Sequence, residues 1–274
     1  MGKKLPPRHR QIIGMVEEKG YISIERLSQH FDVTPQTIRR DINKLSDDGL
    51  LRRYHGGAGP NTSVSNFSYS ERRVLRSVEK SRVARLVAKH IPNNASLFLD
   101  IGTSTEEVAK ALLSKSGLRV ITNNMNVVSI LSGSEDFEIF ITGGVVRNHD
   151  LGILGDATVD FIKQFKVDFG IVSVAGIDPD GTLIDFDYNE VRVTRAIMAN
   201  SRRVFLVADH SKFGRGAMAR IGHISEVSAL FTDSPPSQDF MTVIENAGIN
   251  LYIAGSGPAP GTADEEPAGE GDIR

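Results

Sequence analysis

The chain has 274 residues, of which 40% are apolar and 24% charged, an ordinary globular composition with room for one large domain or a small domain plus a larger one. It contains no cysteine, which excludes disulfides, thiolate catalysis and zinc–thiolate sites, and its formal net charge of -2 gives no overall attraction to nucleic acid. No run approaches the roughly 18 apolar residues of a membrane span, and no apolar segment follows the basic start as in a secretory signal, so we expect a cytoplasmic protein with no membrane partner.

Charge is nevertheless distributed unevenly along the chain. Residues 1–60 hold 11 Lys and Arg and 7 Asp and Glu, a net charge of +4, whereas residues 61–274 hold 21 and 27, a net charge of -6. Positive charge confined to a small N-terminal module is what a DNA-binding head attached to an acidic body would show.

Two short helices are predicted first, over residues 7–19 and 23–31. Ser23 is a capping-type residue at the start of the second helix, and a three-residue break, DVT, separates that helix from the next one. Apolar residues at helical spacing define the buried faces of the two helices: Ile12, Ile13, Val16, Ile24, Leu27 and Phe31. The short connection is typical of a helix-turn-helix.

The third helix, in the stretch TPQTIRRDINKL at residues 34–45, has Thr34 as an N-cap and Pro35 as its first residue. Ile38, Ile42 and Leu45 share its apolar face. The opposite face carries Gln36, Thr37, Arg39, Arg40 and Asn43. That face would be a solvated surface if the arginines simply paired with Asp41, Asp47 or Asp48, or a DNA-reading surface in the context of a helix-turn-helix.

A short hairpin is predicted after the third helix. Gly49 is a good residue to end that helix, and LLRRYHGGAG then alternates apolar and basic residues before Gly56 and Gly57. Such a hairpin would form a wing, from which Arg52, Arg53 and His55 would project toward a phosphate backbone.

The run from TPQTIRRDINKL to LLRRYHGGAG resembles the head of the DeoR-type bacterial repressors, a winged helix-turn-helix group. The resemblance implies that the third helix reads the major groove of operator DNA, where Arg suits guanine and Gln suits adenine. Asp41 would orient an arginine rather than face DNA. The DNA-binding residues so implied are Thr34, Gln36, Thr37, Arg39, Arg40, Asn43, Arg52, Arg53 and His55.

Four segments follow from the patterning. Residues 1–60 form the DNA-binding domain, and residues 61–75, which begin rich in Ser and Asn, form a linker. A helix over residues 79–90, stopped by Pro92, opens a larger domain at residues 76–254. Residues 255–274, rich in Gly, Pro, Ala and acid, form a disordered acidic tail.

The larger domain alternates strands with helices. Seven apolar runs are strand candidates: 96–100, 118–122, 137–143, 167–176, 203–209, 228–233 and 249–253. Helical patterns such as 105–113, 125–132, 157–165 and 189–200 lie between most of them. This alternation predicts an α/β domain with a mostly parallel sheet, covered on both faces.

Polar and Gly-rich loops follow the predicted strands, and ligands of such sheets bind at the carboxyl ends of the strands. The loop after the first strand, Asp100 to Thr105, precedes a helix and would suit a phosphate. Taken singly, each loop could be an ordinary cap, turn or surface segment. The loops contribute Asp100, Gly102, Thr103, Ser104, Thr105, Asn123, Asn124, Gly143, Gly144, Gly176, Asp178, Asp209 and Lys212 to a predicted small-anion site. The first loop is neither a Walker A motif nor GxGxxG, so we expect no nucleotide cofactor and no metal.

The resemblance to DeoR-type repressors extends through DIGTST, AGID, FDYNEVRVTRAIM and ADHSKFGR to most of residues 76–253. It implies a sensor domain whose fold is similar to ribose-5-phosphate isomerase, with a phosphate held by residues 102–105 and further contacts from Lys80, Asp209 and Lys212. Three stretches are most similar to the members that control glycerol-3-phosphate metabolism, so glycerol 3-phosphate is the first inducer hypothesis and fructose 1-phosphate the second. The family also implies dimers or tetramers.

An active isomerase fused to a DNA-binding head is the alternative of a different class. The resemblance supplies Asp178 and Glu190 as candidate carboxylates for acid–base chemistry. The glycine-rich lysine loop that such isomerases place between those positions is missing, because the interval PDGTLIDFDYN has no Lys or Arg. We therefore expect an effector-binding site without catalysis.

Overall fold

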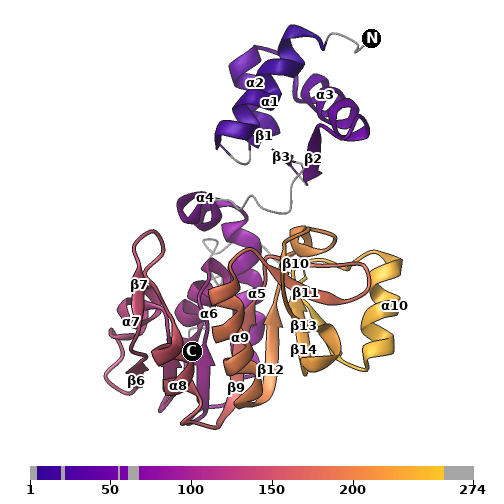
Figure 1. The fold of residues 1–274 in the computed structure, drawn as a ribbon. Coiled ribbons are helices and arrows are strands. Elements are labelled where there is room, and N and C mark those ends of the chain that lie inside the picture. The colour runs from indigo at the N-terminus through magenta and orange to yellow at the C-terminus, as the bar shows by residue number, and fades with distance from the viewer. Residues whose placement is uncertain (1–4, 20–21, 55, 61–67, 256–274) are drawn as a thin grey trace, which may run out of the picture.

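The computed structural model describes residues 5–19, 22–54, 56–60 and 68–255 of the chain. Figure 1 shows a small helical head at one end, a larger body built around a sheet, and helix α4 (Tyr69–Val74) at the top of the body, where the head joins it. The predicted wing residue His55, the first half of the predicted linker and the predicted acidic tail beyond Gly255 lie outside the described residues.

The head contains α1 (Pro7–Lys19), α2 (Ile24–Phe31) and α3 (Pro35–Asp47), as predicted. Thr34 Oγ1 accepts the backbone N–H of Thr37 at 3.3 Å, which caps α3, and Gly49 just beyond α3 has a φ of +70° that glycine adopts without strain. Apolar residues of all three helices form one core, which includes the buried residues Ile12, Val16, Leu27, Ile38, Ile42 and Leu45. The predicted winged helix-turn-helix is therefore confirmed.

The wing is a three-stranded antiparallel sheet in the order β1 (Ile22–Ser23), β3 (Gly57–Pro60), β2 (Leu51–Tyr54). The hairpin β2–β3 was predicted, but the two-residue strand β1 was not, because a segment this short has no periodicity. Its pairing with β3 attaches the wing to the start of α2.

The sheet of the body has seven parallel strands in the order β15-β14-β12-β9-β4-β5-β6. Their bounds are β4 (Ser96–Leu99), β5 (Arg119–Thr122), β6 (Glu138–Ile141), β9 (Val167–Ser173), β12 (Ser201–Val207), β14 (Ala229–Thr232) and β15 (Asn250–Ile253). Each of the seven predicted strands corresponds to one of them, which confirms the predicted α/β domain.

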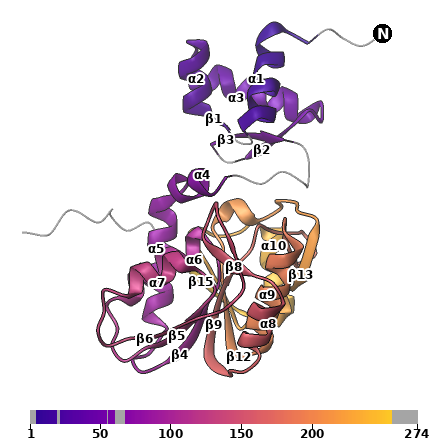
Figure 2. The same cartoon turned by 60° about the vertical axis from the view of Figure 1, so that its left-hand side comes forward.

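Helices cover both faces of this sheet (Figure 2). One face carries α5 (Ser77–Lys89), α6 (Thr103–Leu112) and α7 (Met125–Leu131), and the other carries α8 (Asp156–Ile162), α9 (Tyr188–Ala199) and α10 (Gln238–Ala247). Successive residues of β4 alternate between the two cores, since Leu97 and Leu99 pack with α5 and α6 while Phe98 packs on the opposite side. Within the described ranges, no helix combines the length and the apolar character needed to cross a membrane.

Two small sheets that the sequence did not indicate lie outside the main one. The hairpin β7 (Val145–Arg147) and β8 (Gly152–Leu154) follows β6, and β10 (Gly176–Ile177), β11 (Thr182–Asp185) and β13 (Ala219–His223) form an antiparallel sheet. Two short 3-10 turns, η1 (His210–Lys212) and η2 (Ile224–Glu226), complete the structure. The sheet β10–β11–β13 and the turn η1 carry several loops predicted to bind an anion.

Candidate functional site

The polar face of α3 is open to solvent. Gln36, Arg39, Arg40 and Asn43 are exposed, and Thr37 is half-buried. Thr34 is also exposed, and its hydroxyl lies 2.9 Å from that of Thr37. A helix of this kind presents its exposed side chains to base edges and phosphates when it enters the major groove.

Asp41 lies on the buried side of α3 and binds α1. Its carboxylate accepts Arg8 Nε at 2.7 Å and Nη2 at 3.2 Å, and His9 Nε2 lies 2.9 Å away. Burial alone would raise the pKa of Asp41, but the hydrogen bonds from Arg8 and His9 lower it below its usual value. Asp41 therefore orients an arginine, as predicted, and that arginine is Arg8.

Arg39 and Arg40 do not use the pairing partners that a solvated face would offer. Asp41 is bound to α1, and in the described part of the chain no ion pair joins Arg39 or Arg40 to a carboxylate. Both side chains are exposed to solvent.

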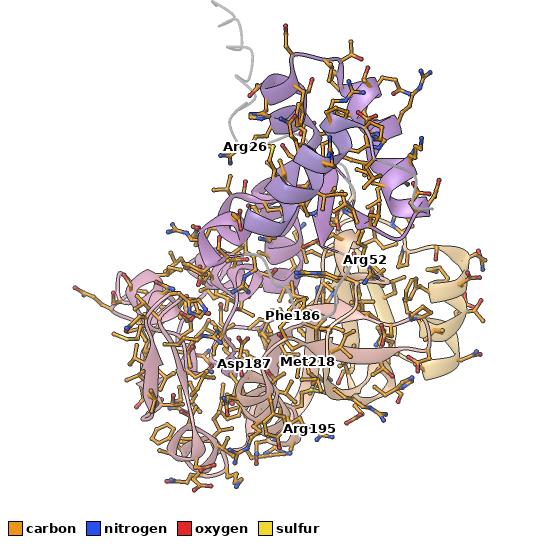
Figure 3. All side chains as sticks on the ribbon, turned by 45° about the horizontal axis from the view of Figure 1, so that its top comes forward. Arg26, Arg52, Phe186, Asp187, Arg195 and Met218 are labelled. Atoms are coloured by element: carbon orange, nitrogen blue, oxygen red, sulfur yellow. The ribbon has the colours of Figure 1, made fainter. Side chains whose placement is uncertain are left out.

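The two wing arginines have different surroundings. Arg53 is exposed and its Nη1 donates to Asn43 Oδ1 at 2.9 Å, which connects the wing to the recognition helix. Arg52 lies where the head meets the body (Figure 3), and a Cβ added at Gly216 would lie 3.0 Å from its Nη1. Arg52 and Arg53 also line a recess against residues 210–215 of the body.

A polar cavity lies at the carboxyl edge of the main sheet. The loops after β4, β9 and β12 converge there, and α4, α5, α9 and the end of β11 close it. Its lining consists of Arg72, Leu75, Lys80, Asp100, Ile101, Gly102, Thr103, Ser104, Ser173, Val174, Ala175, Asp185, Glu190, Thr194, Asp209, Ser211, Lys212 and Arg215. Six of these polar residues were predicted to contact the effector and stand in strand-end loops or near the start of α5: Lys80, Asp100, Thr103, Ser104, Asp209 and Lys212.

Gly102 allows the start of α6 to lie at the wall of this cavity. It is the N-cap of that helix, with a φ of +143°, and a Cβ at this position would lie 2.6 Å from Ser173 Oγ. Only glycine fits there without displacing Ser173. The chain can therefore bring the free N–H groups at the beginning of α6 to the cavity, where they and the helix dipole favour an anion.

Four basic side chains line the cavity: Arg72, Lys80, Lys212 and Arg215. Lys80 is buried and donates to Thr103 Oγ1 at 2.9 Å and to the carbonyl oxygen of Arg72. Burial lowers the pKa of Lys80 to about 8. Lys212 is partly accessible within the cavity, but the surrounding protein desolvates its ammonium and lowers its pKa to about 7, helped by the nearby Arg215. Burial therefore disfavours the charged forms of both lysines.

Carboxylates also line the cavity: Asp100, Asp185, Glu190 and Asp209. Burial raises the pKa of Asp100 to about 7 although Thr194 Oγ1 donates to it at 2.6 Å. Burial and the neighbouring Asp185 likewise raise the pKa of Glu190 to about 7. Burial alone would raise the pKa of Asp209, but Lys212 and Ser211 hold it below its usual value. Carboxylates can accept hydrogen bonds from hydroxyl groups, so the cavity suits a small ligand with an anionic end and a hydroxylated end.

Seven of the residues predicted to bind the effector lie outside the cavity lining: Thr105, Asn123, Asn124, Gly143, Gly144, Gly176 and Asp178. The first three are buried with intramolecular partners. The hydroxyl of Thr105 donates to the carbonyl oxygens of Asp100 and Gly102. Asn123 Nδ2 donates to the carbonyl oxygen of Ile153, and Asn124 caps α7.

The three glycines have conformational or packing roles instead. The carbonyl of Gly143 accepts Thr158 Oγ1 at 2.7 Å, and Gly144 has a φ of +143°. A Cβ at Gly176 would lie 1.8 Å from the carbonyl oxygen of Arg215, so glycine permits β10 to approach that loop.

Asp178 lies in the turn between β10 and β11, where its backbone N–H donates to the carbonyl oxygen of Thr182 at 2.9 Å. Glu190 lines the cavity and binds Arg147. The two carboxylates of the isomerase hypothesis are therefore not assembled around one cavity.

Six polar lining residues were missed from the sequence: Arg72, Ser173, Asp185, Thr194, Ser211 and Arg215. Arg215 and Ser211 stand in the same loop as the predicted Asp209 and Lys212, which was a usable signal. Arg72 stands in the predicted linker, and residues 69–74 form α4 against the body. Asp185 and Thr194 belong to β11 and α9, away from any strand-to-helix loop of the main sheet.

Comparison with known proteins gives the same two-part organisation. A family model described as the DeoR-like helix-turn-helix domain matches residues 8–64, and one described as the DeoR C terminal sensor domain matches residues 76–234. The chain is 52% identical to the glycerol-3-phosphate regulon repressor of Escherichia coli (strain K12), over 91% of this chain and 99% of that relative. It is 52% identical to the repressor of the same name from Haemophilus influenzae, over 84% of this chain and 89% of that relative. It is also 41% identical to the HTH-type transcriptional repressor CsqR of Escherichia coli (strain K12), over 90% and 95%.

The sensor body also has remote structural neighbours. One is a D-ribose-5-phosphate isomerase in complex with phospho-erythronic acid, at 15% identity and a TM-score of 0.37, covering 49% of this chain and 52% of that one. The likeness is too distant to bear on ligand or activity. The relatives of high identity are named as repressors.

Proposed function

Since this chain belongs to the DeoR family of transcriptional regulators, we propose that it represses genes of glycerol-3-phosphate metabolism by binding operator DNA until a phosphorylated effector releases it. The observation that carries the effector half of the proposal is one cavity in which the start of α6 meets Lys80 and Lys212. The exposed polar face of α3 and the wing arginines support the proposal that the head binds operator DNA.

Glycerol 3-phosphate is the effector that we propose. Its phosphate would bind Gly102, Thr103 and Ser104 at the start of α6, with Lys212 as the charged partner. Its hydroxyl groups would lie toward Asp209 and the remaining carboxylates of the cavity. The support is the name of the relatives at 52% identity, together with a cavity lined by a helix start, basic side chains and carboxylates. Fructose 1-phosphate is the alternative with the same chemistry.

Self-association and location complete the proposal. A helix-turn-helix that reads a repeated operator works with two or more copies, so we propose a homodimer or homotetramer. The chain would act in the cytoplasm, where the operator is accessible.

The test is operator affinity with and without glycerol 3-phosphate for wild type, Lys212→Ala and Thr103→Ala. Both variants should bind operator as wild type does, because the head is unchanged, but release it weakly on addition of the effector. A ligand shifts the DNA-binding equilibrium only by its differential affinity for the two states, and these variants remove phosphate contacts. Lys212→Ala should have the larger effect, since charge-assisted hydrogen bonds are stronger than neutral ones.

Lys89→Ala provides the matched control, because Lys89 is an exposed lysine at the end of α5, outside the cavity lining. It should respond to glycerol 3-phosphate as wild type does. Normal release by both cavity variants would place the anion site elsewhere. A wild type that ignores glycerol 3-phosphate but responds to fructose 1-phosphate would keep the site and overturn the ligand assignment.

A further inference from the structure

Arg76 stands at the junction between α4 and α5 in an unusual backbone conformation. Its φ of +56° and ψ of 36° place it in the left-handed region, which residues other than glycine rarely adopt. Together with Leu75, it separates the two helices and turns the chain between them. Strained residues of this kind persist only where the surrounding structure holds them, and they gather at switch regions.

The side chain of Arg76 is held by the effector-site loop. It is 8% exposed, with its Nε 3.5 Å from Asp209 Oδ1, and its Nη1 contacts His210 Nε2. His210 in turn places Nδ1 2.6 Å from Asp233 Oδ2. A ring that donates from Nδ1 to Asp233 can accept from Arg76 at Nε2, so these groups form one connected network.

The loop that holds Arg76 also supplies the ligand-facing groups Asp209, Ser211 and Lys212. Asp209 therefore faces the cavity and Arg76 at once. A ligand that binds Lys212 changes the charge beside Asp209, and Asp209 is one of the groups that hold Arg76 in place. The change thus reaches the backbone of the chain at the α4–α5 junction.

Helix α4 is also attached to the body at its N-terminal end, away from Arg76. Ser68 and Glu71 form a capping box at its start, and Tyr69 Oη donates to the buried carboxylate of Glu106 on α6, 3.0 Å from each oxygen. Arg72, one turn later, lines the cavity and lies 3.8 Å from Asp150. Only residues 61–67 separate Ser68 from β3 of the wing. Arg76 therefore stands at the body end of α4, and Ser68 stands at the end from which the chain continues toward the wing.

We propose that Arg76 is the positioning residue that couples effector binding to the DNA-binding head, through its contacts with Asp209 and His210. This inference rests on the proposed effector function. Arg76 lies outside the cavity lining, so its role is to transmit the state of the cavity and not to bind the ligand. Coupling between two sites requires contacts that differ between two states, and the proposal assigns that role to the contacts of Arg76 with Asp209 and His210.

The test compares Arg76→Gly with wild type in the full-length chain. Glycine accepts the left-handed backbone conformation, so the fold is kept while the guanidinium is removed. Three quantities are measured: operator affinity alone, operator affinity with saturating glycerol 3-phosphate, and affinity of the free protein for glycerol 3-phosphate. We expect Arg76→Gly to bind both ligands, but the ratio of operator affinities without and with effector to fall by about tenfold or more.

Two further variants separate coupling from folding. Arg76→Lys keeps a positive charge near Asp209 and should restore part of the ratio. Arg85→Ala removes an exposed arginine of α5 whose Nη1 donates to Ser81 Oγ at 3.1 Å, and it should behave as wild type.

If the ratio of operator affinities without and with effector is the same in Arg76→Gly as in wild type, the inference is overturned and the proposed function stands. Loss of glycerol-3-phosphate binding in Arg76→Gly would also overturn it, because Arg76 would then belong to the ligand site itself. A wild type that responds to neither glycerol 3-phosphate nor fructose 1-phosphate would overturn the proposed function, and the coupling role with it.

Discussion

The ammonium of Lys80 lies 2.9 Å from the hydroxyl oxygen of Thr103 and donates a hydrogen bond to it. Because the hydroxyl of Thr103 accepts from Lys80, its own proton is free to donate to a ligand oxygen. The contact joins α5 to the first residue of α6, so a basic side chain and a helix N-terminus act on the same point of the cavity. The strength of this hydrogen bond depends on the charge of Lys80, so we expect effector affinity to depend on pH.

Effector binding should take up protons at pH 8. The pKa of Lys212 is lowered to about 7 and that of Lys80 to about 8, so both are partly neutral there. A bound phosphate stabilises their charged forms and raises both pKa values. Affinity should therefore be retained near pH 7 and fall as pH rises toward 9, by up to about tenfold per pH unit for each proton taken up. Calorimetry in buffers of different ionisation enthalpy counts these protons.

Lys212→Arg is the control for that measurement, because a guanidinium stays charged throughout this range. It should bind glycerol 3-phosphate at pH 8 with a smaller proton uptake than wild type. Hydrogen bonds from the effector's hydroxyl groups to Asp100 and Glu190, whose pKa values are raised to about 7, would lower those values and release protons near neutrality, so the measurement is made at pH 8. Binding at pH 8 with no proton uptake would contradict the placement of the phosphate beside Lys212.

Removing a guanidinium from the recognition helix should weaken operator binding without unfolding the head. Arg39→Ala or Arg40→Ala should cost roughly 1–3 kcal/mol if that arginine makes a bidentate contact with guanine. Both side chains are exposed and outside the buried core, so helicity should be unchanged. Fluorescence anisotropy with operator DNA measures the loss, and Arg220→Ala, an exposed position on the body, serves as the control. Wild-type affinity in both head variants would restore the solvated-face interpretation of α3.

The wing should contribute charge rather than sequence preference. Neutralising Arg53 should lower affinity for all DNA sequences alike and flatten the dependence of log affinity on log salt by about one unit per lost phosphate contact. Arg53 also binds Asn43, so Asn43→Ala tests whether that hydrogen bond positions the wing. A changed sequence preference with an unchanged salt slope in Arg53→Ala would be inconsistent with a phosphate contact.

Asp41→Asn should loosen the attachment of α1 to α3. The carboxylate holds Arg8 and lies beside the buried His9, and its loss should cost about 1–2 kcal/mol, since solvent partly screens Arg8. Because the folded-state pKa of Asp41 is lowered, its stabilisation is complete above the unfolded pKa of about 3.9 and is lost as pH falls through the folded value. Hydrogen exchange of α1 and α3 in the full-length chain at neutral pH measures the effect. Equal protection in wild type and Asp41→Asn would show that the ion pair does not stabilise the head.

The main fold could be predicted from the sequence because its signals are local. Thr34, Pro35 and Gly49 mark the ends of the recognition helix, and the core residues recur at the spacing of one helix face. The strands of the body are short apolar runs, fully buried at the centre of the sheet and partly exposed in the edge strands β6 and β15, so each is recognisable without knowing its neighbours. The strand-end loop from Asp100 to Ser104 could also be placed, since the carboxyl ends of parallel strands share one edge.

The tertiary structure alone decided which of those loops meet and what else meets them. Asn123 and Gly143 follow neighbouring strands, as Asp100 does, but neither lines the cavity. Asn123 donates to the carbonyl oxygen of Ile153, and the carbonyl oxygen of Gly143 accepts from Thr158. Arg72, Asp185 and Thr194 reach the cavity from α4, β11 and α9, whose positions depend on packing between distant segments. Sequence spacing records which residues share a face of one element, because that follows from helix and strand geometry. It does not record how far one element lies from another, because that distance is set by the packing of the whole core.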